Sequence, residues 1–354
     1  MSAVISALHY CVPAERLTQA ELTARFGAGP VQSIAKMSGI LERRVAPPGV
    51  TAADLAYGAA RGLLAARAVD AATIDLLIFA SQTPDFQIPA TACVLQHRLG
   101  LRMDCAAFDL NQGCSAYPYA LAVADGLITS GVAKRALVLN ADTVSHVIHP
   151  QDRSLLALHG DGAAATLLEP AVEENTGLRG FALGSDGSGA PYICMPASGA
   201  RQPRSEVTRR EKSDEAGNVR TDEHLGMNGP AVFHFSVSRM PDIIRGALQK
   251  WGLTVEDLDL VLLHQANRMM VDLIYKSLKI AEGKRFYFME TVGNLAGASV
   301  AVVLAEAWRQ GRLKPGSLTL LVAFGNGLSW GLALHRWPSE LPPPVSAPVD
   351  YAAE

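Results

Sequence analysis

Short, continuous apolar runs alternate along this chain with alanine- and leucine-rich segments of helical length. The apolar runs are too short for helices and show no strict alternation, which is typical of strands buried on both faces of a parallel sheet. They lie at residues 74–80, 135–139, 259–263 and 318–322, with a less distinct one at 4–8. The helical segments lie at residues 52–68, 90–99 and 116–128. This order of strands and helices predicts an α/β fold of packed layers.

The spacing of landmark residues ahead of the apolar runs occurs twice along the chain. The interval from Gly62 to Asp75 equals the interval from Gly246 to Asp259, and each aspartate stands directly before an apolar run. In both copies an arginine precedes the glycine and an apolar pair follows it. One such match could arise by chance, so a second, independent match is needed before a duplication is inferred.

The second match involves a cysteine in one copy and an asparagine in the other. The interval from Cys114 to Gly131 equals the interval from Asn294 to Gly311, and an apolar run follows each glycine. Two coincident spacings with the same order of elements indicate an internal duplication, with a unit much longer than a solenoid repeat. Cys114 and Asn294 are then expected at equivalent positions, each at the start of a helix.

The duplication predicts two halves followed by a tail. The N-terminal half covers residues 1–175, the C-terminal half covers 176–337, and a proline-rich tail covers 338–354 and is expected to be loose. A segment at residues 201–223, here the charged insertion, interrupts the second half. Twelve of its 23 residues are charged and it has no periodicity. It is interpreted as a solvated loop or flap.

Composition and charge exclude several classes of protein. Among 354 residues, 49% are hydrophobic and 18% charged, enough for a large core, and the net charge of −3 gives no electrostatic argument for nucleic acid. No apolar run is long enough to span a bilayer, and the start of the chain lacks signal-peptide features. The five cysteines are scattered without a CxxC pair, which predicts no zinc site and no disulfide framework. A cytoplasmic protein is expected.

Cys114 stands where an apolar run ends in polar and glycine residues and a helical segment begins. A thiol at that place lies near the positive end of the helix dipole and near unpaired backbone N–H groups. Both features favour the thiolate, which is the nucleophilic form. Gly113 leaves room for a ligand close to the backbone. An arbitrary free cysteine is more often a small buried apolar residue, so the assignment depends on further residues.

Those residues are His264 and Asn294. His264 directly follows the apolar run at residues 259–263, and ligands of α/β proteins bind at the carboxyl ends of strands. The duplication places Asn294 opposite Cys114. Two mechanisms use this set of three. In thiol hydrolysis, histidine activates cysteine and asparagine orients histidine. In acyl transfer with carbon–carbon bond formation, histidine and asparagine donate hydrogen bonds to a thioester oxygen that becomes an enolate.

These motifs resemble those of the β-ketoacyl-ACP synthase III family, over about residues 35–337. The matching segments are Asn-Gln-Gly-Cys-Ser at 111–115, Gly-Asp-Gly-Ala at 160–163, His-Gln-Ala-Asn at 264–267, Gly-Asn at 293–294, Lys-Pro-Gly at 314–316 and Ala-Phe-Gly-Asn-Gly-Leu-Ser-Trp-Gly at 323–331. The order and spacing of these segments make the resemblance specific.

The resemblance implies an internally duplicated thiolase-type fold in five layers, α-β-α-β-α, and a homodimer. It implies that Cys114 carries the acyl group while His264 and Asn294 promote decarboxylation of malonyl-ACP. The backbone N–H groups of Cys114 and Gly327 would form the oxyanion hole. Ile88 would cap the acyl pocket of the partner subunit. The substrates would be acyl-CoA or acyl-ACP and malonyl-ACP, with no metal and no cofactor.

The chain departs from the family at the CoA site. Ser33 stands where the family often has a tryptophan that stacks on adenine, and Met37 stands where an arginine is frequent, whereas Arg153 matches a CoA-contacting arginine. The acyl donor is therefore expected to be an acyl-carrier protein as readily as CoA. Basic residues past His264 are the expected docking site for that carrier, and they are Arg268, Lys276 and Lys279.

Several functions stay open on the residues alone. The first expectation is decarboxylative Claisen condensation that yields β-ketoacyl-ACP, in fatty acid biosynthesis or a secondary-metabolite pathway. An alternative within the same site is acyl transfer to an alcohol, amine or aryl acceptor. More remote alternatives are a thiol hydrolase and a catalytically inactive scaffold. The intact set of Cys114, His264 and Asn294 argues against the scaffold.

Overall fold

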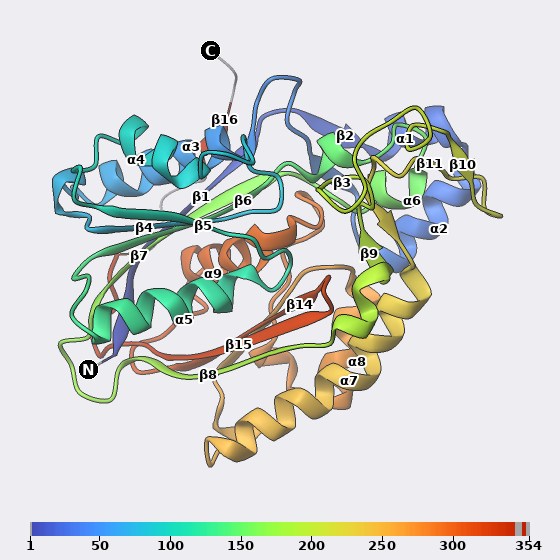
Figure 1. The fold of residues 1–354 in the computed structure, drawn as a ribbon. Coiled ribbons are helices and arrows are strands. Elements are labelled where there is room, and N and C mark those ends of the chain that lie inside the picture. The colour runs from blue at the N-terminus through green and yellow to red at the C-terminus, as the bar shows by residue number, and fades with distance from the viewer. Residues whose placement is uncertain (1, 344–348, 352–354) are drawn as a thin grey trace.

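Two β-sheets form the framework of the protein (Figure 1). The computed structural model describes residues 2–343 and 349–351. The first sheet has the strand order β16 (Val349–Tyr351), β1 (Ala3–Pro13), β7 (Gly162–Pro170), β6 (Ala136–Asp142), β4 (Leu76–Ala80), β5 (Ala106–Leu110). The second has the order β13 (Leu260–Leu263), β14 (Leu318–Gly325), β15 (Ser329–Arg336), β8 (Gly177–Ser185).

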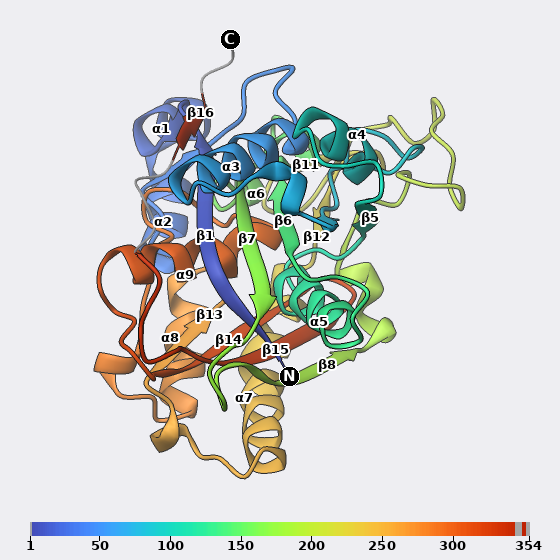
Figure 2. The same cartoon turned by 90° about the vertical axis from the view of Figure 1, so that its left-hand side faces the viewer.

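Helices cover the outer face of each sheet and fill the space between the sheets (Figures 1 and 2). One outer layer consists of α3 (Ala52–Ala66) and α4 (Thr91–Arg98), which share an apolar cluster with the first sheet. The middle layer consists of α5 (Ala116–Thr129) and α9 (Ser299–Arg309). The other outer layer consists of α7 (Gly229–Lys250) and α8 (Arg268–Ser277) on the second sheet. This arrangement confirms the five-layered α-β-α-β-α fold.

Burial explains why the inner strands have continuous apolar sequences. Every residue of β4, β6, β13 and β14 is buried, because helices cover both faces of these strands. The four apolar runs predicted as buried strands are therefore confirmed. The predicted helices also form, with ends shifted by one or two residues, as expected where helix termini fray. The run at residues 4–8 extends into the longer strand β1.

The two sheets share one topology, which supports the duplication inferred from spacing. In the first, β4 is parallel to β6, β6 is antiparallel to β7, and β7 is antiparallel to β1. In the second, β13, β14, β15 and β8 repeat these three relations in order. A parallel bridge from Val261 to Arg285 stands where β4 pairs with β5 in the first sheet. The boundary between the halves at residue 175 stays a prediction.

The tail differs from the loose segment expected from its prolines. Residues 349–351 form β16, which pairs in parallel with the open edge of β1. The side chain of Tyr351 packs against the apolar cluster beneath α3. An unpaired strand edge accepts another strand readily, which explains this addition. Residues 344–348 and 352–354 of the predicted tail lie outside the described residues.

The charged insertion at residues 201–223 lies beside the main layers (Figure 1) and contacts residues 151–153. Much of it is exposed, as predicted for a solvated loop. It is nevertheless anchored, because Arg220 forms an ion pair with the fully buried carboxylate of Asp152. The short elements of this region are α1 (Gln19–Phe26), α2 (Ala28–Ser38), α6 (Arg153–Leu156), β2 (Arg16–Thr18), β3 (Glu42–Arg44), β9 (Ile193–Cys194), β10 (Lys212–Ser213), β11 (Val219–Arg220) and β12 (Gly226–Met227).

Candidate active site

A cavity of about 1280 Å³ lies at the carboxyl ends of the inner strands of both sheets. Cys114 enters it from the turn between β5 and α5, and His264 enters it directly after β13. Asn294 enters it from the segment ahead of α9. The structure therefore brings together the three residues that the sequence singled out. The duplication explains this meeting, because equivalent strand ends of the two halves face each other across the middle layer.

The thiol of Cys114 is enclosed by backbone. A Cβ atom at Gly325 would lie 2.9 Å from its Sγ atom, so only glycine fits at that position. The backbone N–H groups of Asn326 and of Cys114 itself face the sulfur. Burial nevertheless raises the pKa of the Cys114 thiol to about 12, and the nearby Asp142 adds to this rise. The N–H groups at this turn favour the thiolate, as expected, but desolvation outweighs them and the thiol rests protonated.

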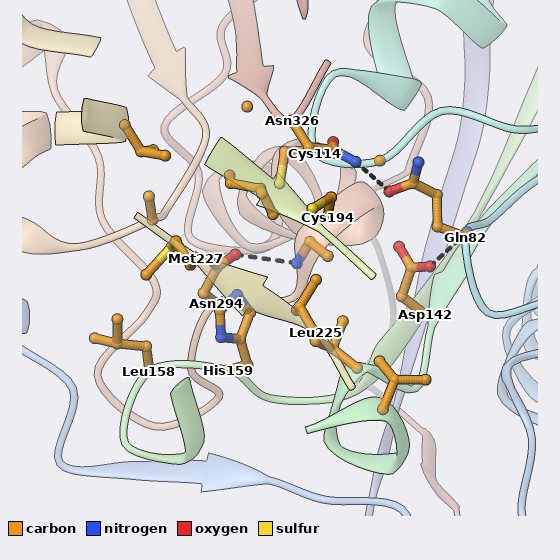
Figure 3. A pocket seen from close by; sticks show the side chains of 18 of the residues that line it. Gln82, Cys114, Asp142, Leu158, His159, Cys194, Leu225, Met227, Asn294 and Asn326 are labelled. Atoms are coloured by element: carbon orange, nitrogen blue, oxygen red, sulfur yellow. Dashed lines mark hydrogen bonds between the residues drawn. The ribbon is translucent and has the colours of Figure 1, made fainter. Parts of the chain in front are cut away.

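Asp142 was not anticipated from the sequence. It ends β6 and is fully buried, and its Oδ1 accepts a 2.8 Å hydrogen bond from the N–H of Gln82. Its Oδ2 accepts a 3.0 Å bond from the N–H of Gly297 in the other half. Burial raises the pKa of Asp142 to about 6. This carboxylate therefore links the two halves close to Cys114, and Figure 3 shows it next to Gln82.

His264 is uncharged in its resting state. Burial lowers its pKa to about 3, and the neighbouring His159 lowers that pKa further. The ring packs edge-on against Phe324, with 5.9 Å between ring centroids. Nδ1 is buried without a hydrogen-bond partner among the described residues, which leaves Nε2 as the nitrogen that reaches the cavity. A neutral imidazole can donate a hydrogen bond to a developing negative charge without first losing a counter-ion.

Asn294 is held by its backbone and by its side-chain oxygen. Its N–H donates to the carbonyl of Leu158 at 2.9 Å, and its own carbonyl accepts from the N–H of Gly160 at 3.0 Å. Its Oδ1 accepts from the N–H of Ala296 at 3.0 Å (Figure 3). Because the oxygen is engaged, the Asn294 side chain presents its NH₂ group, which only donates.

The far side of Cys114 carries amide side chains that the sequence did not predict as part of the site. Asn326 donates a 2.5 Å hydrogen bond to Gln82 (Figure 3). Gln82 in turn donates a 3.3 Å bond to Asn111. A Cβ atom at Gly113 would lie 2.3 Å from the side-chain oxygens of both Gln82 and Asn326. The glycine expected to leave room for a ligand thus leaves room for these amides.

Of the three predicted nucleotide contacts, only Met37 lines the same cavity. Met37 lines it and is 47% exposed, and Ser33 lies one turn earlier on α2 and is also exposed. Arg153 does not point to open space, since it donates to the carbonyl of Ala216 in the charged insertion. The charged insertion contributes further lining residues, which are Arg204, Asp214, Asn218 and Arg220. It is part of the cavity wall, which its composition alone did not show.

The remaining predicted residues lie on the surface. Ile88 is 90% exposed. Arg268 and Lys276 lie on α8 and are exposed, and Lys279 follows that helix. Arg268 pairs with Asp272 at 3.1 Å and stacks over a tyrosine ring at 3.6 Å. Among the described residues, no group of three or more histidine, cysteine, aspartate or glutamate side chains could hold a metal ion. In the same residues, no helix is both long and apolar enough to cross a bilayer.

Two stacked sheets that bring a cysteine, a histidine and an asparagine to one cavity define a condensing enzyme of the thiolase fold. The family model described as 3-oxoacyl-[acyl-carrier-protein (ACP)] synthase III matches residues 108–187, and the model of its C-terminal part matches residues 248–337. The chain therefore belongs to the β-ketoacyl-ACP synthase III family, which consists of acyltransferases.

Individual relatives give the same result. The chain is 38% identical to a β-ketoacyl-ACP synthase III of Caldanaerobacter subterraneus subsp. tengcongensis, over 86% of this chain and 88% of the relative. It is 37% identical to β-ketoacyl-ACP synthase III 3 of Streptomyces coelicolor, over 96% and 98%. A crystal structure of a 3-oxoacyl-ACP synthase III superimposes with a TM-score of 0.93 at 41% identity, over 95% of this chain and all of that one.

Proposed function

We propose that this protein condenses an acyl group on Cys114 with malonyl-ACP, releasing CO₂ and β-ketoacyl-ACP. The observation that carries the proposal is the state of the three cavity residues. Cys114 supplies a thiol beside backbone N–H groups, while His264 is neutral and Asn294 presents a free NH₂ group. Such donors suit a reaction that develops negative charge on a thioester oxygen.

The first half-reaction loads the enzyme. The sulfur of Cys114 attacks the donor thioester, a new C–S bond forms, and the donor thiol leaves with the proton that Cys114 loses. The oxyanion of this step is assigned to the N–H groups of Cys114 and Gly327. In the described part of the chain, the N–H of Gly327 has no other hydrogen-bond partner, which leaves it available.

The second half-reaction makes the carbon–carbon bond. Malonyl-ACP loses CO₂, and the electron pair of the broken bond becomes an enolate whose oxygen accepts hydrogen bonds from His264 and Asn294. The enolate carbon attacks the acyl carbonyl on Cys114, the C–S bond breaks, and the Cys114 sulfur regains a proton. No cofactor takes part in this scheme. We also propose that the protein is cytoplasmic.

The direct test supplies an acyl donor and malonyl-ACP and measures both products. We expect CO₂ and β-ketoacyl-ACP in equal amounts, because each condensation releases one CO₂. Release of free acid without chain extension would instead identify a thiol hydrolase. CO₂ release without a β-ketoacyl product would show that the acyl group is not the acceptor of the enolate.

We expect an acyl-carrier protein to rival CoA as the acyl donor. Ser33 cannot stack on adenine, Met37 carries no charge, and Arg153 is engaged with the charged insertion. An aromatic side chain stacked on a base contributes about 1–3 kcal/mol, roughly tenfold to a hundredfold in affinity. Ser33→Trp is therefore expected to raise kcat/KM for acyl-CoA by up to that factor and leave acyl-ACP unchanged.

A control at the neighbouring position sharpens this test. Ser33 stands four residues before the cavity-lining Met37 and shares its face of α2, whereas Gln32, which is also exposed, points away from that face. Gln32→Trp should leave both donors unchanged. A parent enzyme that strongly prefers CoA, with no response to Ser33→Trp, would contradict the expectation.

The carrier is proposed to dock on Arg268, Lys276 and Lys279, beside the exposed apolar side chains of Met269 and Leu273 on α8.

We expect the protein to be a homodimer in which Ile88 reaches the acyl pocket of the partner subunit. Ile88 and Phe86 are 90% and 50% exposed in the single chain, and apolar side chains that protrude together are typical of interfaces. Ile88→Glu is expected to shift the protein toward monomer in light scattering, because it places a charge in that interface. Val172→Glu is the matched control, since Val172 is a fully exposed valine elsewhere. A monomeric parent protein at assay concentration would refute the proposal.

A further inference from the structure

A second histidine, His159, lies beside the catalytic set, although the condensation scheme gives it no role. It precedes β7 and forms an isolated parallel bridge with Asn294. Two backbone hydrogen bonds hold this contact: Asn294 accepts one from the N–H of Gly160 and donates one to the carbonyl of Leu158. His159 lines the cavity and is close enough to His264 to lower the pKa of that ring. Figure 3 shows its imidazole next to the Asn294 side chain.

The hydrogen bonding of His159 fixes where its proton lies. Nδ1 is 3.2 Å from the carbonyl oxygen of Leu155, and a carbonyl oxygen can only accept, so Nδ1 carries the proton. Nε2 then has a free lone pair and no hydrogen-bond partner within residues 2–343 and 349–351. Nε2 is not one of the fully buried nitrogens, so it is accessible from the cavity that His159 lines. Burial lowers the pKa of His159, which keeps the ring neutral at neutral pH and leaves the Nε2 lone pair unprotonated.

A structural role explains His159 poorly. Its neighbours in the cavity wall include the apolar side chains of Leu158, Leu225 and Met227 (Figure 3). An apolar residue of similar size would complete this wall without placing a polar nitrogen at the cavity surface. A free, neutral, acceptor nitrogen beside a reaction centre is instead the arrangement required of a general base.

Condensation with malonyl-ACP does not need such a base. Decarboxylation produces the carbon nucleophile by breaking a C–C bond, so no proton has to be removed from it. An alcohol or an amine, by contrast, must lose a proton as its oxygen or nitrogen attacks a thioester. We propose that His159 is a general base that allows the acyl group on Cys114 to be transferred to a hydroxyl or amine acceptor. This inference rests on the proposed acylation of Cys114.

The transfer step needs only the acyl-enzyme, the acceptor and His159. Nε2 of His159 takes the proton of the acceptor O–H or N–H while the acceptor atom forms a bond to the acyl carbon. The tetrahedral intermediate collapses, the C–S bond to Cys114 breaks, and the proton held by His159 returns to the Cys114 sulfur. The products are an ester or amide and the free thiol, with no oxidant or other reactant required.

The test prepares the acyl-enzyme and follows the acyl group on Cys114 by intact mass. One arm adds a panel of small alcohols and amines, and the other adds malonyl-ACP. Removal of a general base typically lowers a rate by about 10²–10⁴-fold. His159→Gln is therefore expected to lower the rate of transfer to hydroxyl and amine acceptors, relative to the rate of condensation, by about that factor. Free imidazole should restore transfer in His159→Gly, because it can fill the vacated space.

A matched variant separates lost chemistry from lost stability. His335 is another buried histidine with a pKa lowered to about 3, and it lies on β15 outside the cavity. His335→Gln should keep transfer once rates are normalised to thiol titration of Cys114. Transfer that survives in His159→Gln, an equal loss of condensation, or a parent enzyme that transfers to no acceptor or to water alone would each overturn the role of His159. A parent enzyme that is never acylated would overturn the proposed function as well.

Discussion

Cys114→Ala is expected to abolish the acyl adduct and all product formation. The protein contains five cysteines, and only Cys114 combines a place in the cavity with backbone N–H groups directed at its sulfur. Removal of the nucleophile leaves the acyl donor without a group to attack it. Intact-mass analysis after incubation with acyl-CoA and with acyl-ACP should show the unmodified mass for the variant and a single acyl adduct for the parent.

Cys194 provides the decisive control for this experiment. It lines the same cavity from β9, but its Sγ is directed to the carbonyl of Pro191, and burial raises its pKa. Cys194→Ala should keep the adduct. If the adduct disappears in Cys194→Ala, or persists in Cys114→Ala, the assignment of the nucleophile is wrong.

Asn294→Ala is expected to lose decarboxylation while it keeps self-acylation. In the proposed scheme the free NH₂ group of Asn294 donates to the enolate oxygen of the malonyl thioester, and the loss of one such donor typically costs about 10²–10³ in rate. CO₂ release from malonyl-ACP should fall by that factor, whereas the burst of Cys114 acylation should stay near the parental rate. The two half-reactions are measured separately, by labelled CO₂ and by intact mass.

Asn294→Asp separates the NH₂ group, which is the proposed hydrogen-bond donor, from the side-chain oxygen, which holds the loop through the N–H of Ala296. An aspartate can still accept the hydrogen bond of Ala296, but it has no NH₂ group to donate. It should therefore lose decarboxylation as Asn294→Ala does, although the loop remains in place. Equal losses of acylation and decarboxylation in both variants would show that Asn294 supports the nucleophile rather than the enolate.

The sequence was sufficient for the fold, and it singled out three residues that the structure brings to one cavity. Strands buried on both faces need continuous apolar runs, so β4, β6, β13 and β14 could be located from hydrophobicity alone. The equal intervals around Cys114 and Asn294 revealed the duplication, and strand ends are where α/β folds place their ligands. The positions of strands, helices and the residues at strand ends can be predicted in this way, because hydrophobic periodicity and turn residues are local properties of the chain.

Only the tertiary structure decided the electrostatic state of the site. Burial and the nearby Asp142 raise the pKa of the Cys114 thiol, and no local pattern reports either effect. The carboxylate of Asp142 and the bridge from His159 to Asn294 depend on segments more than a hundred residues apart meeting at one cavity. The pairing of β16 with β1 joins the two ends of the chain in the same way. Sequence periodicity locates the elements, but burial, pKa and the partners of each polar atom are set by which elements come to lie against one another.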